Sequence, residues 1–370
     1  MKKNNKSVGI LTMPVKENYG GVIQAAALYN FLETNGYKPC LILKKYDETL
    51  IKRIMRNFLS NNPFYFIFDY KNLTRREKQS KLLIRFIDKF FKNKTKIIYD
   101  KTTFLNEVSK LETIVVGSDQ VWRFNYIGSN YKYYFLAYVP HSIKKISYAA
   151  SFGVEEWEGP SSTIEDIKSL LKNFNRVSVR EKSGVNICKE VFQFNDAKHV
   201  LDPTFLPSIE FYESIINEEI IHKKVNLFSY VLDNSHYVSN TISLISKLLN
   251  LEVSEIKLTE YKNKLNPSLS EWLYHYKNAQ FIVTDSFHGM VFSILFNKQF
   301  VCIGNKSRGF ARFESLLEDF NLKDRLIFDY DQNIIQDLVN NPIDYQKVNS
   351  IKSALIKTSK EFLLNGLIEE

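Results

Sequence analysis

Short apolar runs alternate with amphipathic segments along most of the chain, and this alternation predicts strands followed by helices. The first unit is an apolar strand at 7–14, a helix at 22–37 whose apolar positions recur at helical spacing, and a second strand at 38–45. Asn35 and Gly36 are typical of a helix C-terminus. Because a strand–helix–strand unit joins parallel strands, the sheet is expected to be parallel.

The alternation resumes after a basic segment and falls into two series. The first series has strands at 113–122, 144–153, 176–181 and 198–203, with helices at 162–174 and 182–191. Asp202-Pro203 interrupts the pattern. The second series has strands at 224–232, 251–258, 280–286 and 299–304, with helices at 237–250, 268–279, 288–297 and 311–320.

Two such series predict an α/β protein made of two doubly wound, Rossmann-like domains that face each other across a cleft. We expect an N-terminal domain at 1–205 with a basic helical insertion at about 44–96, a second domain at 206–342, and a helical tail at 343–370. A chain of 370 residues is long enough for two domains. Ligands of this class bind at the carboxyl ends of the strands, so polar residues at strand ends are the first candidates.

Three strand ends in the first domain carry such residues. Asn18, Gly20 and Gly21 lie between the first strand and its helix, where glycines permit close backbone approach and the helix N-terminus favours an anion. An ordinary tight turn explains these residues equally well. Gly117, Ser118 and Asp119 follow the strand at 113–116, with a helix cap and turn as the alternative.

Arg180 ends the strand at 176–181, and an arginine directed into a cleft suits a carboxylate or phosphate. A surface ion pair is the alternative.

The segment TDSFHG, residues 284–289, ends a strand and begins a dense apolar helix. Asp285 or Ser286 can cap this helix, which places His288 in its first turn. The helix dipole and the free amides attract an anion and disfavour the imidazolium until an anion arrives, so His288 is expected to titrate with ligand occupancy. Gly289 permits close approach. A structural hydrogen bond is the alternative role for His288.

Arg308 and Arg312 lie near the start of the next helix, where either can reach an anion in the cleft. Solvation at the surface is the alternative for at least one of them. The sequence has no HExxH, Gly-x-Ser-x-Gly or dinucleotide-binding motif, and its six histidines are dispersed. We therefore expect an anionic substrate held by arginines and helix ends, with no metal and no redox cofactor.

Several motifs together resemble the polysaccharide pyruvyl transferase family. In order they are NYGGVIQAAAL, VVGSDQVW, SYAASFG, VSVREKSG, VLDPTFL and TDSFHGMVFSILFNKQFVCI, and they extend over residues 8–325. The resemblance implies a GT-B-like fold. It also implies transfer of a pyruvyl group from phosphoenolpyruvate to two hydroxyls of a sugar, which forms a cyclic ketal and releases phosphate. His288 and Arg180 match the family's functional histidine and arginine.

That chemistry needs a proton for C3 of phosphoenolpyruvate and removal of a proton from a sugar hydroxyl. His288 is the first candidate, as an acid, a base or a phosphate ligand, and Asp119 is the second. The expected substrate-binding residues are Arg180, Ser286, Gly289, Arg308, Arg312, Asn18, Gly20, Gly21, Gly117 and Ser118. A GT-B glycosyltransferase that uses a nucleotide sugar is the alternative enzyme.

The net charge of +9 is concentrated in one segment. Residues 44–96 carry fifteen Lys and Arg against five Asp and Glu, a net charge of +10. Basic residues alternate there with apolar ones, which is typical of an interfacial helix, so we predict contact with an anionic membrane surface or docking of a lipid-linked acceptor. Packing of the apolar face on the N-terminal domain is the alternative. A protein that binds nucleic acid or an acidic polymer is a third possibility, but we predict no nucleic-acid partner.

The location expected from the sequence is the cytoplasm, at the inner face of the membrane if the basic segment docks there. The N-terminal apolar stretch is short and ends at Pro14, which disfavours a secretory signal, and no apolar run reaches the ~18 residues of a membrane span. Cys40, Cys188 and Cys302 are scattered, as expected of reduced cysteines.

Overall fold

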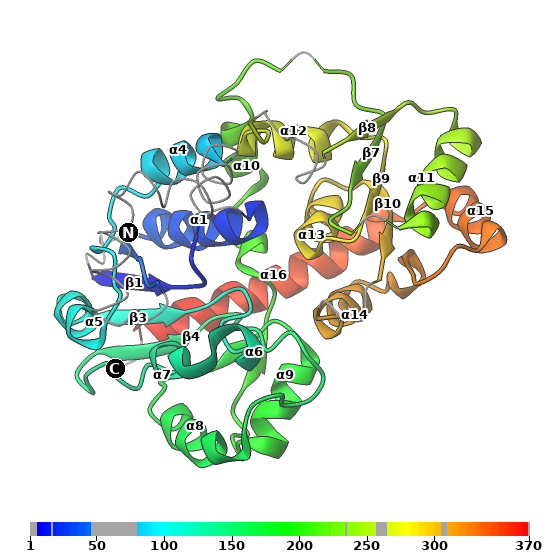
Figure 1. Cartoon of the computed structure of the whole chain (residues 1–370). Helices are drawn as coiled ribbons and strands as arrows, with labels where there is room; N and C mark the ends of the chain where they lie inside the picture. The colour runs from blue at the N-terminus through cyan, green and yellow to red at the C-terminus, as the bar shows by residue number, and fades with distance from the viewer. Residues whose placement is uncertain are drawn as a thin grey trace, which may run out of the picture.

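The structure is a computed structural model, which describes residues 6–15, 18–45, 80–221, 223–233, 235–256, 265–304 and 309–368. Two parallel sheets, each flanked by helices, make up the protein (Figure 1). The predicted α/β class is therefore confirmed. Cys188 and Cys302 are buried free thiols, and Cys40 is partly buried.

The N-terminal sheet has the strand order β2-β1-β3-β4. Its strands are β1 (Ser7–Leu11), β2 (Lys38–Ile42), β3 (Thr113–Val116) and β4 (Lys144–Ser147). A two-stranded sheet of β5 (Ser178–Val179) and β6 (Lys198–His199) continues it through parallel bridges from β4 and the residues after it. All four residues of β3 are buried, because a parallel sheet covered by helices on both faces has no solvent-facing side.

The helices around this sheet are α1 (Tyr19–Thr34), α4 (Lys81–Phe90), α5 (Lys101–Val108), α6 (Phe124–Ile127), α7 (Tyr131–Tyr134), α8 (Ile164–Leu171) and α9 (Lys182–Asn186). The sequence pattern did not predict α5. It is an eight-residue helix that buries only two residues, and the Asp100 side chain caps it by accepting a hydrogen bond from the Thr103 amide. Such a short helix carries too few apolar positions for a clear period.

The C-terminal sheet has the strand order β11-β10-β9-β7-β8. Its strands are β7 (Leu227–Tyr230), β8 (Val253–Glu255), β9 (Phe281–Thr284), β10 (Gln299–Ile303) and β11 (Leu326–Ile327). Its helices are α10 (Ile209–Ile216), α11 (His236–Leu249), α12 (Leu269–Asn278), α13 (Phe287–Leu295), α14 (Ala311–Asp319) and α15 (Gln332–Asn340).

The last helix, α16 (Tyr345–Ile368), contacts both halves of the molecule (Figure 1). Near its start, the Tyr345 hydroxyl donates to the Ser293 carbonyl of α13. Near its end, Ser359 Oγ accepts from the Leu201 amide at 3.0 Å, and the Leu367 carbonyl accepts from Lys144. The segment predicted as a tail therefore links the two sheets.

The apolar face of α4 packs against the protein. Leu83 and Ile87 are buried, and the Phe90 ring makes edge contacts with Tyr29 of α1 and Phe211 of α10 at centroid distances of 5.8 and 5.9 Å. For Lys81–Phe90 these contacts support the alternative, packing of the apolar face on the protein, whereas docking of the basic segment on a membrane stays a prediction. Residues 46–79 of the basic segment lie outside the described residues. No described helix is long and apolar enough to cross a bilayer.

Candidate functional site

The carboxyl ends of β3, β5 and β6 bring Asp119, Arg180 and Asp202 into contact. Arg180 Nη1 donates to Asp202 Oδ2 at 2.8 Å, and Nη2 lies 3.4 Å from Asp119 Oδ1. Arg180 and Asp202 are both buried. Because the carboxyl ends of parallel strands meet at one edge of a sheet, residues from three separate motifs converge here. The alternative of a surface ion pair for Arg180 is excluded by its burial.

Gly117 and Ser118 shape the turn that carries Asp119. Gly117 has φ +119°, and a Cβ there would lie 2.2 Å from the Tyr148 carbonyl oxygen, so only glycine fits. Ser118 Oγ donates to Asp202 Oδ2 at 2.9 Å, and its amide donates to the Gln24 side chain. In this structure both residues hold the charged groups in place; their contact with substrate remains a prediction.

His288 reaches the same place from the C-terminal sheet. Ser286 caps α13 by accepting from the Gly289 amide, which puts His288 in the first turn as expected. Asp285, the other candidate cap, accepts from the amides of Leu232 and Asp233 in the loop after β7. The His288 ring is buried, and Nε2 lies 3.9 Å from Asp202 Oδ1. The candidate site therefore lies at the junction of the two sheets.

The start of α1 packs directly on the His288 ring. Asn18 caps α1 by accepting from the Gly20 amide at 3.0 Å. A Cβ on Gly20 would lie only 2.1 Å from His288 Nδ1, whereas a Cβ on Gly21 would meet Asp119 Oδ2 at 3.6 Å. The amino ends of α1 and α13 thus meet around His288, and amides at helix amino ends favour an anion.

The remaining predicted residues differ in their placement. The Arg312 guanidinium carbon lies 5.3 Å from the centre of the Phe287 ring, and that of Arg180 lies 4.6 Å from the same ring, so both arginines are brought to the site. Arg308 lies outside the described residues. Gly289 faces the protein interior, where a Cβ would lie 2.3 Å from Thr284 Oγ1. Close packing against β9 thus accounts for Gly289 without a ligand.

The family of the chain follows from its match to a family model. The model of the polysaccharide pyruvyl transferase family matches residues 18–307, which include Asn18, Asp119, Arg180 and His288. The chain belongs to this family. No curated protein matches the chain in sequence.

Solved structures establish the fold of this pyruvyl transferase family member. UDP-GlcNAc 2-epimerase from Neisseria meningitidis, crystallised with UDP-GlcNAc, superposes with a TM-score of 0.56 at 10% identity, covering 99% of this chain and 100% of the epimerase. A putative UDP-N-acetylglucosamine 2-epimerase from Listeria monocytogenes gives a TM-score of 0.54 at 11% identity, covering 98% and 95%. The fold is therefore GT-B-like, as predicted. At such identity the likeness concerns the fold alone.

The electrostatics of the candidate site favour a neutral His288. Burial lowers the pKa of His288 to about 4; Asp202 opposes this shift and Arg180 adds to it. The direction agrees with the sequence-based expectation, although desolvation is the largest cause. Burial alone would raise the pKa of Asp202, but His288, Arg180 and the hydrogen bonds to its oxygens outweigh burial and lower it. Burial and the neighbouring Arg180 lower the pKa of Arg312 to about 10.

Buried polar atoms without partners surround this centre. Among the described residues, Arg180 Nε, His288 Nε2 and Glu181 Oε2 are buried and make no hydrogen bond. Unpaired buried polar groups are costly, which suggests that a ligand completes the site. Asp202 and Glu181 were not among the predicted site residues. The available signal was their position at strand ends within two of the matched motifs, VLDPTFL and VSVREKSG.

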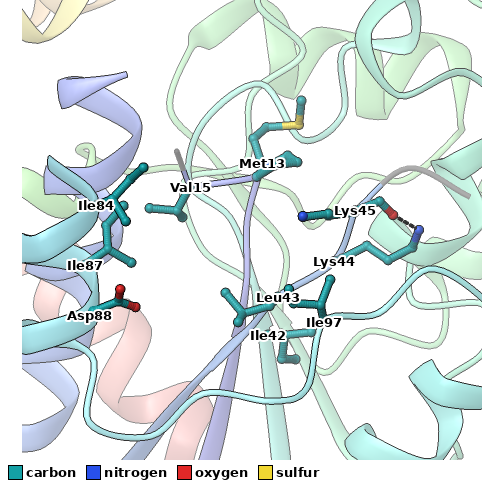
Figure 2. Close-up of a pocket in the computed structure, with 11 residues that line it drawn as sticks. Met13, Val15, Ile42, Leu43, Lys44, Lys45, Ile84, Ile87, Asp88 and Ile97 are labelled. Carbon is teal, nitrogen blue, oxygen red and sulfur yellow. Dashed lines mark hydrogen bonds between the residues drawn. The ribbon is translucent and has the colours of Figure 1, made fainter. Parts of the chain in front are cut away.

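A mostly apolar pocket of about 220 Å³ lies at the carboxyl edge of the N-terminal sheet (Figure 2). Met13 and Val15 of the β1–α1 loop line it, together with Ile84 and Ile87 of α4 and Lys45 after β2. Thr12, next to the lining residue Met13, donates to the Ser118 carbonyl at 2.8 Å, which connects the β1–α1 loop to the turn that carries Asp119. Within the described part of the chain, no group of three or more His, Cys, Asp or Glu side chains is placed to hold a metal ion.

Proposed function

We propose that this protein transfers a pyruvyl group from phosphoenolpyruvate to a sugar of a polysaccharide or of its lipid-linked precursor, forming a cyclic ketal and releasing phosphate. The supporting observation is the pairing of the buried Arg180 with the half-buried Arg312 beside His288, at the amino ends of two helices. Phosphoenolpyruvate carries a carboxylate and a phosphate on one small frame. Two guanidinium groups and two helix ends match those charges.

The reaction requires two proton movements. Protonation of C3 makes C2 electrophilic, one sugar hydroxyl adds to C2, and a second hydroxyl displaces phosphate to close the ketal. One hydroxyl proton balances the new C3–H bond, and the other leaves with phosphate. His288 is the group we assign to proton transfer, because it is the ionisable side chain that lies against both helix ends. Asp119, partly exposed and held by Arg180, is assigned to a sugar hydroxyl.

Charge neutralisation in this proposal comes from the protein. The buried Arg180 and the half-buried Arg312 stabilise the donor and the departing phosphate, and such interactions are stronger where water is excluded. No metal or organic cofactor is assigned a role. Adding a chelator to the reaction is the direct check, and activity that disappears and returns with one divalent ion would contradict this part of the proposal.

The acceptor is proposed to be carried by a lipid. The pocket between the β1–α1 loop and α4 is lined mainly by apolar side chains, and Lys44, Lys45 and Asp88 also line it. A mostly apolar pocket at the carboxyl edge of the same sheet suits the hydrocarbon part of a carrier, with a lysine near its anionic head. Short-chain lipid-linked sugars should therefore be better acceptors than the free oligosaccharides, through a lower KM.

One experiment tests the function. The protein is incubated with phosphoenolpyruvate and a panel of sugar acceptors, and phosphate release is followed together with the mass of the product. Release must depend on the acceptor and must accompany a pyruvyl ketal. In parallel, phosphoenolpyruvate and uridine or guanosine diphosphate sugars are compared for protection against thermal unfolding. Protection by a nucleotide sugar alone, without acceptor-dependent phosphate release, would favour the glycosyltransferase alternative that the GT-B-like fold also allows.

A further inference from the structure

Asp202 divides its two carboxylate oxygens between two sides of the site. Oδ2 accepts from Arg180 Nη1 at 2.8 Å and from Ser118 Oγ at 2.9 Å. Oδ1 accepts from the Thr204 amide at 3.1 Å and the Thr204 hydroxyl at 2.8 Å. Oδ1 also faces His288 Nε2 at 3.9 Å. One buried carboxylate therefore touches the arginine and faces the histidine.

The His288 side of this arrangement is incomplete. The separation of 3.9 Å between Nε2 and Oδ1 is too long for a hydrogen bond, and Nε2 has no other partner. On its opposite side the ring lies against Gly20 in the first turn of α1, with Nδ1 as the nearest ring atom. The two ring nitrogens thus point toward different neighbours, a carboxylate and a helix amino end.

We propose that Asp202 is a positioning residue for His288: when an anion enters the site, the ring takes up a proton and Nε2–H donates to Asp202 Oδ1, which leaves Nδ1–H directed at the anion. Thr204 and Ser118 hold the carboxylate in place for both of its tasks. Catalytic histidines commonly depend on a carboxylate that orients one nitrogen while the other acts, and short contacts often form only when the ligand is bound. The proposal rests on the proposed function of His288 in proton transfer.

The charges around His288 come from four elements. Asp202 at the end of β6 and Asp119 at the end of β3 favour the imidazolium, whereas Arg180 at the end of β5 and Arg312 of α14 oppose it. The start of α1 contributes only backbone next to the ring. Without an anion, burial and the two arginines keep the pKa of His288 near 4. A bound anion adds negative charge on the Nδ1 side, so the pKa should rise toward the physiological range.

The test uses inorganic phosphate as the probe and nuclear magnetic resonance of the histidine rings of the full chain. The His288 signals are assigned by their loss in His288→Gln. In the native protein, phosphate should raise the pKa of His288 by about two units and produce an Nε2–H signal that is protected from exchange. The proposal would be overturned if the His288 ring stays neutral when phosphate is bound, or if its Nε2–H exchanges freely with water. This measurement needs no variant of Asp202.

Three variants separate charge from structure. Asp202→Asn should lower the pKa of His288 in the phosphate-loaded protein by at least about one unit, a tenfold change in the imidazolium fraction. Thr204→Val removes one hydrogen bond to Oδ1 but keeps the carboxylate, so the pKa of His288 should fall less than in Asp202→Asn. Glu181→Gln is the control, because it removes a buried carboxylate next to Arg180 that is not among the main charges acting on His288. It should leave the pKa of His288 within about half a unit of the native value.

The assignment would be refuted if the pKa of His288 in Asp202→Asn equals the native value, or if it falls by the same amount in Glu181→Gln. The acid limb of the pH profile of kcat/KM for phosphate release should shift in the same variants that shift the pKa of His288. Phosphate binding reports on Asp202 without turnover, and acceptor-dependent phosphate release reports on the proposed function. Each can therefore fail without the other.

Discussion

The contact between Gly20 and His288 makes Gly20→Ala the most informative single substitution. The new methyl would lie 2.1 Å from Nδ1 and 2.7 Å from Cγ of the ring, well inside van der Waals contact. The ring or the helix must therefore move. Overpacking of this kind costs roughly 1–3 kcal/mol. Alanine in place of a helical glycine contributes about 1 kcal/mol in the opposite direction.

Gly21→Ala is the matched control in the same helical turn. Its methyl would meet Asp119 Oδ2 at 3.6 Å, which is an ordinary contact, so only the gain in helix propensity of about 1 kcal/mol is expected. The free energy of unfolding should therefore differ between the two variants by about 1–3 kcal/mol, with Gly20→Ala the less stable. Denaturant unfolding measures this difference when both variants show the same dependence of the free energy of unfolding on denaturant concentration.

Activity measurements should distinguish the loss of stability in Gly20→Ala from the displacement of the His288 ring. A displacement of the His288 ring by about 1 Å can lower kcat about 100-fold, even when the fold is retained. Acceptor-dependent phosphate release and the chemical shifts of the His288 ring are the two readouts. If Gly20→Ala is as stable as Gly21→Ala and keeps full activity and unshifted His288 signals, then α1 does not pack on the histidine and the description of the site is wrong.

The remaining predictions concern His288, Arg180 and the basic segment. His288→Ala should lower kcat at least ~100-fold with an unchanged circular dichroism spectrum, and near-normal turnover would remove His288 from the mechanism. Arg180→Lys keeps the charge but loses the two-pronged geometry, so donor affinity measured by calorimetry should fall; unchanged affinity in both Arg180→Lys and Arg180→Ala would exclude a donor contact. Because the pKa of His288 is about 4 in the folded protein and about 6.5 in the unfolded chain, the unfolded chain binds more protons between these values. The free energy of unfolding should thus fall by up to ~3 kcal/mol as the pH drops from 6.5 to 4. His288→Gln should remove this contribution to the pH dependence of the free energy of unfolding. If residues 44–96 dock on membranes, the protein should co-sediment with anionic but not neutral vesicles, less so at high salt or after charge reversal at 75–81; absence of binding at low salt would end that prediction.

The sequence alone determined the order of strands and helices where their periods are long and clear. Apolar runs such as 113–116 and 281–284 are buried strands because only a sheet covered on both faces hides every side chain. A helix cap at Asp285 or Ser286, and the place of His288 in the first turn of α13, also followed from local chemistry, and the structure assigns the cap to Ser286. Short helices such as α5 escaped the pattern because one or two buried positions make no period.

Only the tertiary structure decided which of these residues share a site. Gly20 and His288 come from opposite ends of the chain, and nothing in either local sequence records that one packs on the other. In the sequence, Asp202 was interpreted as part of a break between two domains. In the structure it is buried and bonded to Arg180, which makes it the central carboxylate of the site. The face of α4 has the pattern of an interfacial helix, but Leu83 and Ile87 are buried and Phe90 contacts Phe211 of a distant segment. Periodicity reports which side of an element is apolar, whereas the partner of that side depends on long-range packing.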